Sequence, residues 1–195
     1  MPREFVPHDY QQIALDHILS TKRNALWASM GLGKTSVCLT AIDNLQLVEP
    51  EPVLVLAPKR VAATTWPDEA AKWSHLQSLD VTPILGSAAE RKAALKADSA
   101  VFTMNYENLP WLIEHYGKNW PFKTIIADES TRLKSYRSRG GSKRARALAK
   151  ICHSHVDRFI ELTGTPSPNG LIDLWGQAYF LDGGERLGYS FGAFK

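Results

Sequence analysis

The hydrophobic positions of the chain fall into short continuous runs separated by longer mixed segments. The runs are Asn24–Ala28, Val53–Ala57, Ala100–Met104, Thr124–Ala127 and Arg158–Thr163, with a weaker one at Val81–Leu85. Continuous apolar runs, unlike a strict alternation of apolar and polar residues, are typical of strands covered on both faces of a sheet. We therefore predict that these runs form a buried, mostly parallel sheet.

The mixed segments between the runs predict helices. Their approximate ranges are 9–20, 34–47, 61–75, 88–97, 105–116, 142–154 and 170–181. In the first range, Ile13, Ile18 and Leu19, together with Ala14 and Leu15, form an apolar stripe at helical spacing. The repeated alternation of strand and helix predicts an α/β domain.

The composition narrows the class of protein. The chain has 195 residues, of which 44% are hydrophobic and 22% charged, as expected for one globular domain with its own core. The two cysteines, Cys38 and Cys152, lie far apart in sequence and predict neither a zinc site nor a disulfide framework. We see no apolar signal segment and no window long enough to cross a membrane, so we expect a cytoplasmic protein without a membrane partner.

The charge is unevenly distributed. Residues 132–150 contain eight basic side chains and no acidic one, whereas the whole chain has 23 Lys and Arg against 20 Asp and Glu. The rest of the chain is therefore net acidic. A solvated loop is one interpretation of the basic segment, and a nucleic-acid partner is the other. The basic residues are Arg132, Lys134, Arg137, Arg139, Lys143, Arg144, Arg146 and Lys150.

A glycine-rich stretch directly follows the first predicted strand. It reads Ala28-Ser-Met-Gly-Leu-Gly-Lys-Thr35 and matches the phosphate-loop pattern, with alanine at the first glycine position. Glycines let backbone N–H groups turn inward toward phosphates, and the next helix directs its positive end at them. Lys34 then reaches the β- and γ-phosphates, and the Thr35 hydroxyl ligates Mg²⁺. The predicted loop contacts to a nucleoside triphosphate are Met30, Gly31, Leu32, Gly33, Lys34, Thr35 and Ser36.

An acidic pair, Asp128-Glu129, ends the predicted strand at Thr124–Ala127. In a phosphate-loop protein the first carboxylate holds Mg²⁺ and the second polarises the attacking water as general base. A solvated acidic pair is the alternative, but the phosphate loop favours catalysis. We predict Lys34, Asp128 and Glu129 as catalytic residues and Thr35 and Asp128 as metal ligands, for Mg²⁺-dependent cleavage of a nucleoside triphosphate.

The stretch Leu162-Thr-Gly-Thr-Pro166 turns sharply at the end of another predicted strand. It places the Thr163 and Thr165 hydroxyls at the carboxyl edge of the sheet, where open α/β folds bind ligands. With Asn169 and Leu174-Trp175, the stretch resembles the third motif of the Swi/Snf-type branch of the superfamily 2 helicases and translocases. Other matches follow in the family's order: "DYQQIALDHIL", "SMGLGKT", "VLAPKRVAATTWPDE", "TMNYENL" and "ADESTRLKS".

The resemblance implies a three-layer RecA-like α/β domain that binds and hydrolyses ATP with Mg²⁺. It implies that Gln11 reads the adenine, and that Thr163 and Thr165 couple hydrolysis to motion. The implied partner is DNA, double-stranded and bound largely through its phosphates without sequence preference. The matching nucleic-acid contacts are Lys59, Arg60, Asn105, Tyr106, Arg132 and Lys134.

Two departures from the family pattern concern motif II and the start of the loop. The family commonly has Asp-Glu-Ala-His, whereas this chain has Asp128-Glu-Ser-Thr131, so Thr131 replaces a histidine that links hydrolysis to domain motion. Small residues, Ala28-Ser29, replace an acidic pair before the loop, and we expect no loss of phosphate binding. We expect the six tryptophans to pack in the core or in clefts, namely Trp27, Trp66, Trp73, Trp111, Trp120 and Trp175.

The matched motifs cover only the first of the family's two RecA-like domains. We expect residues 1–195 to form that first domain and to be a piece of a longer protein, because the chain stops without a clear closing element and without the second domain's arginine fingers. Our first hypothesis is the first motor domain of a DNA-dependent ATPase. The second is a nucleotide- or DNA-binding module with little turnover by itself. A phosphate-loop kinase or nucleotide switch is disfavoured, since neither explains "LTGTP" or Gln11.

Overall fold

The predicted strands form one parallel sheet in the computed structural model of the chain, which describes residues 1–137 and 140–194. The sheet has six strands in the order β1-β6-β5-β2-β4-β3, and each neighbouring pair is parallel. This result confirms the predicted α/β class. The strands are β1 (Arg23–Trp27), β2 (Val53–Ala57), β3 (Val81–Pro83), β4 (Val101–Asn105), β5 (Thr124–Asp128) and β6 (Arg158–Thr163).

The apolar runs are continuous because both faces of the sheet are covered by helices. Strand β2 shows this directly, since Leu54 and Leu56 belong to one core cluster, whereas Val53, Val55 and Ala57 belong to the other. All five residues of β2 are buried. A strand between two helical layers has no solvent face, so it has no polar alternation.

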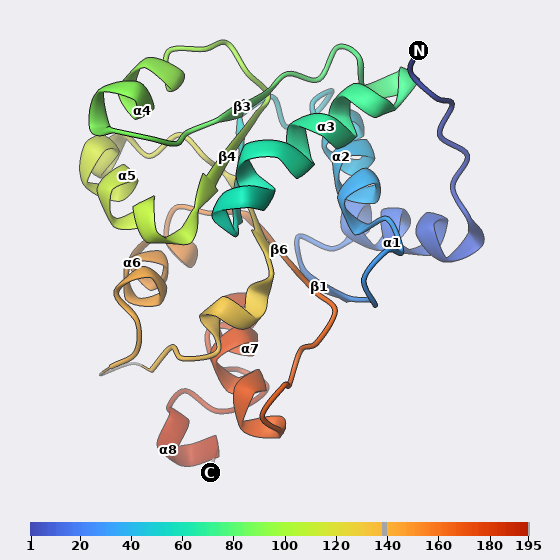
Figure 1. Cartoon of the computed structure of the whole chain (residues 1–195). Coiled ribbons are helices and arrows are strands. Elements are labelled where there is room, and N and C mark those ends of the chain that lie inside the picture. Colours follow the sequence, from blue (N-terminus) through green and yellow to red (C-terminus); the bar gives the residue numbers. More distant parts are fainter. Residues whose placement is uncertain (138–139, 195) are drawn as a thin grey trace.

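Helices form the two outer layers (Figure 1). Helices α1, α2 and α3 contribute to one core cluster, and α5, α6 and α7 contribute to the other. Helix α4 has no buried residue, and none of the helices described is long and apolar enough to cross a membrane. The helices are α1 (Asp9–Ser20), α2 (Lys34–Leu45), α3 (Trp66–Lys72), α4 (Ala88–Ala94), α5 (Leu109–Tyr116), α6 (Lys143–Cys152), α7 (Leu174–Asp182) and α8 (Phe191–Phe194).

Several predicted helices are shorter than expected because a π-helical or 3₁₀ turn precedes the α-helix. The range 61–75 begins as a π-helical turn over Val61–Thr65 before α3, and 105–116 begins as a 3₁₀ turn over Tyr106–Asn108 before α5. Pro67 and Pro110 lie in the first turns of α3 and α5, where a missing N–H costs nothing. The range 170–181 likewise begins with a 3₁₀ turn at Leu171–Asp173.

A candidate nucleotide site at the carboxyl edge of the sheet

Three adjacent strands bring the predicted motifs to the same edge of the sheet. Trp27 at the end of β1 lies opposite Thr163 of β6, and Asp128 at the end of β5 lies opposite Leu162. The Ala28 N–H also donates to the Thr163 carbonyl at 3.1 Å. Because the strands are parallel, the loops that follow them start side by side. The phosphate loop, the acidic pair and the stretch after β6 therefore meet.

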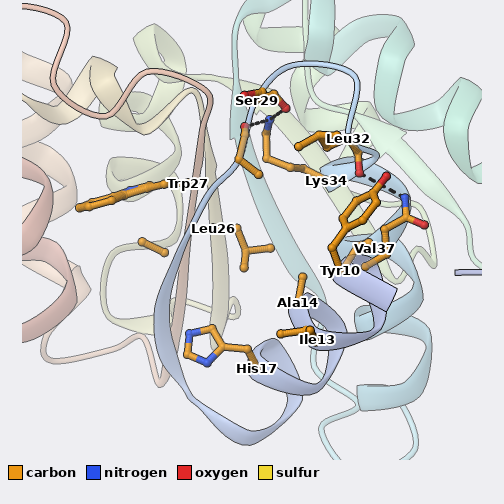
Figure 2. A pocket seen from close by; sticks show the side chains of 13 residues that line it. Tyr10, Ile13, Ala14, His17, Leu26, Trp27, Ser29, Leu32, Lys34 and Val37 are labelled. Carbon is orange, nitrogen blue, oxygen red and sulfur yellow. Dashed lines mark hydrogen bonds between the residues drawn. The ribbon is translucent and has the colours of Figure 1, made fainter. Parts of the chain in front are cut away.

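The phosphate loop has the backbone conformation that its glycines permit. Gly31 and Gly33 have φ angles of 81° and 77°, in the left-handed region that other residues rarely adopt. A Cβ at Gly33 would lie 2.4 Å from the Gln11 side-chain nitrogen, so a side chain there would also collide. The Lys34 ammonium donates to the carbonyls of Ala28 at 2.6 Å and Ser29 at 3.0 Å, which places the cation inside the arc of the loop (Figure 2). A cation in a glycine-rich arc at the start of a helix suits a phosphate.

Gln11 ties helix α1 to the phosphate loop. Its side-chain oxygen accepts from the His8 N–H at 2.9 Å, and its side-chain nitrogen donates to the Leu32 carbonyl at 3.2 Å. The side chain is buried. Its neighbour Tyr10 is half exposed and stacks on His8, with ring centroids 5.5 Å apart. Gln11 therefore lies beside the phosphate loop, and adenine recognition stays a prediction.

Two hollows adjoin at Tyr10, Gln11 and Lys34, which line both. One is a cleft of about 620 Å³ with a mixed polar and apolar lining, which also contains the metal and base candidates Thr35, Asp128 and Glu129. The other, of about 570 Å³, is mostly apolar and lies between helix α1 and strand β1 (Figure 2). Met30, Gly31, Gly33 and Ser36 line the cleft, and Leu32 lines the apolar hollow.

Trp27 lies at the rim of the apolar hollow. The residue is 49% exposed, so of the two predicted environments, core or cleft, Trp27 occupies the edge of a cleft and not the core. Trp27 is the last residue of β1 and the exposed end of that strand. By contrast, Trp66 and Trp175 are fully buried, as predicted.

Asp128 has two buried partners that the sequence pattern did not reveal. The Trp66 indole N–H donates to its carboxylate at 2.9 Å, and the Tyr106 hydroxyl donates to its main-chain carbonyl at 2.8 Å. Burial raises the pKa of Asp128, while the Trp66 hydrogen bond and the Lys34 charge lower it. A threonine hydroxyl and a carboxylate are hard oxygen donors, so Thr35 and Asp128 fit a magnesium ion.

Tyr106 is not available to nucleic acid through its side chain. It is fully buried, because its ring packs in the core and its hydroxyl is engaged by Asp128. The expected contact from this side chain is therefore not supported. The sequence places Tyr106 beside a strand end, but it does not reveal that the 3₁₀ turn points the ring inward.

Glu129 adopts a strained backbone conformation. Its φ of 57° and ψ of 56° lie in the left-handed helical region, and among the described residues it alone does so without being glycine. Such a conformation costs about 1–3 kcal/mol and persists only where neighbouring contacts enforce it. Strain of this kind is often found at functional sites, and the role of Glu129 as a base stays a prediction.

Four of the remaining nucleic-acid candidates differ in availability. Lys59 and Arg60 follow β2 and are exposed. Arg132 lies 3.4 Å from Glu107, and Lys134 lies 3.2 Å from Asp173, so both cations have carboxylate partners.

Asn105 and the basic segment complete this set. The Asn105 amide is buried and donates to Glu107 at 3.0 Å. Glu107 also pairs with Arg144 of the basic segment at 3.2 Å. The basic Arg139 lies outside the described residues. Glu107 therefore neutralises part of the segment's charge.

The two coupling candidates differ in exposure. Thr163 is buried, and its hydroxyl oxygen accepts from the Thr165 N–H at 3.1 Å, whereas Thr165 is exposed. This local hydrogen bond, between residues two apart in sequence, stabilises the turn directly after β6. Thr165 is thus presented at the same edge as the phosphate loop.

A parallel sheet between two helical layers, with a phosphate loop and an acidic pair at one edge, defines a RecA-like ATPase core domain. The comparison with family models agrees with this class. The chain belongs to the SNF2-related domain family, whose model matches residues 10–185.

Curated relatives extend the same result. Putative protein p41 of Acyrthosiphon pisum secondary endosymbiont phage 1 is 60% identical over 98% of this chain, which spans 42% of p41. The transcription regulatory protein SNF2 of Saccharomyces cerevisiae is 30% identical over 89% of the chain, which covers 10% of that protein. The chain therefore spans less than half the length of these relatives.

Solved structures share the fold. The Sulfolobus solfataricus SWI2/SNF2 ATPase core, solved in complex with double-stranded DNA, has a TM-score of 0.77 and 23% identity; the match covers 98% of this chain and 38% of the other. The UvsW helicase of bacteriophage T4 has a TM-score of 0.71 and 14% identity, with 93% and 61% covered. At these identities the likeness concerns the fold.

Proposed function

We propose that the chain is the ATP-binding first motor domain of a DNA-dependent ATPase that hydrolyses ATP with Mg²⁺ to move on DNA. The observation that supports this most is that one cleft contains Lys34, Thr35, Asp128 and Glu129 together. Each of these side chains comes from a motif at the end of a parallel strand. Such a set suits phosphoryl transfer to water, where catalysis depends on positioning and charge stabilisation.

Each residue in the cleft has a distinct role in this proposal. Lys34 binds the β- and γ-phosphates, and Thr35 and Asp128 hold Mg²⁺, which neutralises charge on the phosphates. Glu129 orients and polarises the attacking water. Gln11 and Tyr10, which line both hollows, contact the adenine. Thr163 and Thr165 couple the nucleotide state to domain motion.

We propose double-stranded DNA as the partner, bound mainly through its phosphates. The exposure of Lys59 and Arg60 after β2 supports this, as does the double-stranded DNA in the Sulfolobus complex of the same fold. Contacts of this kind release counterions and carry little sequence information.

A second candidate function is a binding module that turns over little ATP by itself. It is favoured by the cleft lining, since none of the described residues that line the cleft is an arginine. Arginine fingers stabilise the transition-state charge in related enzymes and can arrive from another domain. We propose that a second RecA-like domain of the same polypeptide supplies them, and that the cell compartment is the cytoplasm.

Substitution of Lys34 by alanine tests the proposed function. In the longest protein that contains this chain, we expect Lys34→Ala to abolish DNA-stimulated ATP hydrolysis, because the loop loses its phosphate-binding cation. Lys92→Ala on the exposed face of α4 is the matched control and should hydrolyse ATP at the wild-type rate. Undiminished turnover in Lys34→Ala would contradict the ATPase proposal. A wild-type chain of 195 residues that turns over ATP as fast as the longer protein would contradict the need for a second domain.

A further inference from the structure

Gln177 lies on the inner side of α7, behind the acidic pair, and is fully buried. Its side-chain oxygen accepts from the Ser130 hydroxyl at 2.8 Å. Its side-chain nitrogen donates to the main-chain carbonyls of Pro166 at 2.6 Å and Asp173 at 3.1 Å. One amide thus joins the residue after Glu129 to the loop that follows Thr163.

The orientation of this amide is fixed by its partners. Main-chain carbonyls only accept hydrogen bonds, so the nitrogen of Gln177 must face Pro166 and Asp173. Its oxygen is then directed at Ser130, whose hydroxyl is also fully buried and donates. Both N–H groups and the oxygen are paired, and a fully satisfied buried network of this kind is rigid.

Helix α7 approaches the acidic segment closely enough to transmit small displacements. A Cβ at Gly176 would lie 2.7 Å from the carbonyls of both Leu133 and Lys134, which belong to the turn that follows Glu129. The Lys134 ammonium pairs with Asp173 at 3.2 Å at the start of the same helix. Close packing at Gly176 and the Lys134–Asp173 ion pair therefore hold helix α7 against the turn that follows Glu129.

The Gln177 amide forms a bridge between Ser130 and the Pro166 carbonyl. This bridge has a consequence for Glu129, the predicted base. Glu129 holds a left-handed conformation that a glutamate does not favour, and Ser130 is the next residue in the chain. The main chain of Glu129 is also held by the Arg132 N–H, which donates to the Glu129 carbonyl at 3.0 Å, and by a backbone hydrogen bond to the Asp128 carboxylate. The buried Ser130 hydroxyl fixes the adjoining residue, so loss of its partner releases Glu129 toward unstrained conformations.

We propose that Gln177 is a positioning residue that holds Glu129 in its left-handed conformation through Ser130 and couples it to the Thr163–Pro166 loop. A displacement of either loop is then transmitted to the other through one side chain. The catalytic consequence rests on the proposed ATPase function, whereas the physical link does not.

The catalytic consequence is tested with Ser130→Ala, Gln177→Met and the double variant in the longest protein that contains this chain. Each single variant removes the bond with little change in volume, and we expect kcat to fall about ten-fold because the base is no longer held in place. KM for ATP should stay within about two-fold, because the phosphate loop is untouched. The double variant should be no slower than the slower single variant, since both remove the same bond.

A matched control separates positioning from general stability. Trp120→Phe also removes one buried hydrogen bond, to the Phe122 carbonyl at 2.8 Å, but in the core beside α5. It should lower the melting temperature and leave kcat unchanged. Wild-type kcat in both single variants, multiplied effects in the double variant, or an equal loss in the control would overturn the positioning role.

Hydrogen exchange tests the link itself without requiring turnover. In either single variant, backbone amides of residues 129–134 and 164–168 should exchange faster together, at least about ten-fold above wild type, while amides of β2 stay unchanged. Unchanged exchange in both segments, or faster exchange in one alone, overturns the bridge. If the wild-type protein hydrolyses no ATP, the proposed function fails, and this measurement still decides whether Gln177 joins the two loops.

Discussion

At the scale of single residues, Glu161 is the least expected side chain of the structure. It lies in the middle of β6, is fully buried, and neither carboxylate oxygen has a hydrogen-bond partner within the described part of the chain. Its neighbours across the sheet are Ala25 and Ala127, which offer no polar group from their side chains. Burial raises the pKa of Glu161 well above its ordinary value of 4.5, and the charge of Asp182 raises it further.

We predict that Glu161 makes the protein less stable as pH rises. The folded state binds this proton more tightly than the unfolded state, so the free energy of unfolding falls from pH 4.5 upward, until the raised pKa is passed. Glu161→Gln, which keeps the shape without the charge, should reduce this fall by at least about 1 kcal/mol between pH 5 and pH 8. Urea denaturation at several pH values measures the free energy of unfolding of both proteins and so this difference.

Glu114→Gln, on the exposed side of α5, is the control and should leave the slope with pH unchanged. Equal slopes for the wild type and Glu161→Gln would show that this carboxyl group is solvated or paired.

The sequence predicts site residues where the chemistry requires a local pattern. Glycines, Lys34 and Thr35 lie within a few positions of one another, and their spacing alone carries the signal. Trp66, Ser130 and Gln177 come from three separate segments and meet only in the folded chain. Their hydrogen bonds depend on long-range packing, so the sequence predicted core packing for Trp66 and nothing for Gln177.

At the scale of elements, the contact between α7 and the turn after Glu129 depends on one glycine. We predict that Gly176→Ala lowers the free energy of unfolding by about 1–3 kcal/mol, because the added methyl group overpacks against two carbonyls. Chemical denaturation measures the loss. Gly192→Ala is the control, since a Cβ there meets nothing within 4 Å, and it should be neutral or slightly stabilising. A neutral Gly176→Ala would mean that α7 shifts without cost.

Strands were easier to predict than the starts of helices. Five apolar runs became strands with bounds shifted by a residue at most, because burial on both faces leaves a strong signal. The weak run at Val81–Leu85 became a three-residue edge strand, β3. The π-helical turn at Val61–Thr65 and the 3₁₀ turns depend on how each loop closes over the sheet, which periodicity does not describe.

At the scale of the whole molecule, the charge distribution predicts how DNA binding responds to salt. We predict that Lys59→Ala and Arg60→Ala each weaken binding to any duplex sequence and reduce the slope of log affinity against log salt by about one. Fluorescence anisotropy at several salt concentrations measures this slope.

Lys118→Ala, exposed beyond α5, should leave the slope unchanged. A loss that depends on DNA sequence, or wild-type slopes in both variants, would contradict phosphate contacts by Lys59 and Arg60.

The neighbour of β1 in the sheet has a consequence for how the protein is made. Within the described residues, β1 pairs with β6 alone, so Arg23 of the first strand lies beside Phe159 of the last. A chain emerging from the ribosome exposes the phosphate loop early, yet its strand has no partner until β6 has been synthesised. Contacts between such distant segments form late and slowly. We therefore expect the phosphate loop to be among the last parts of the nascent domain to become ordered.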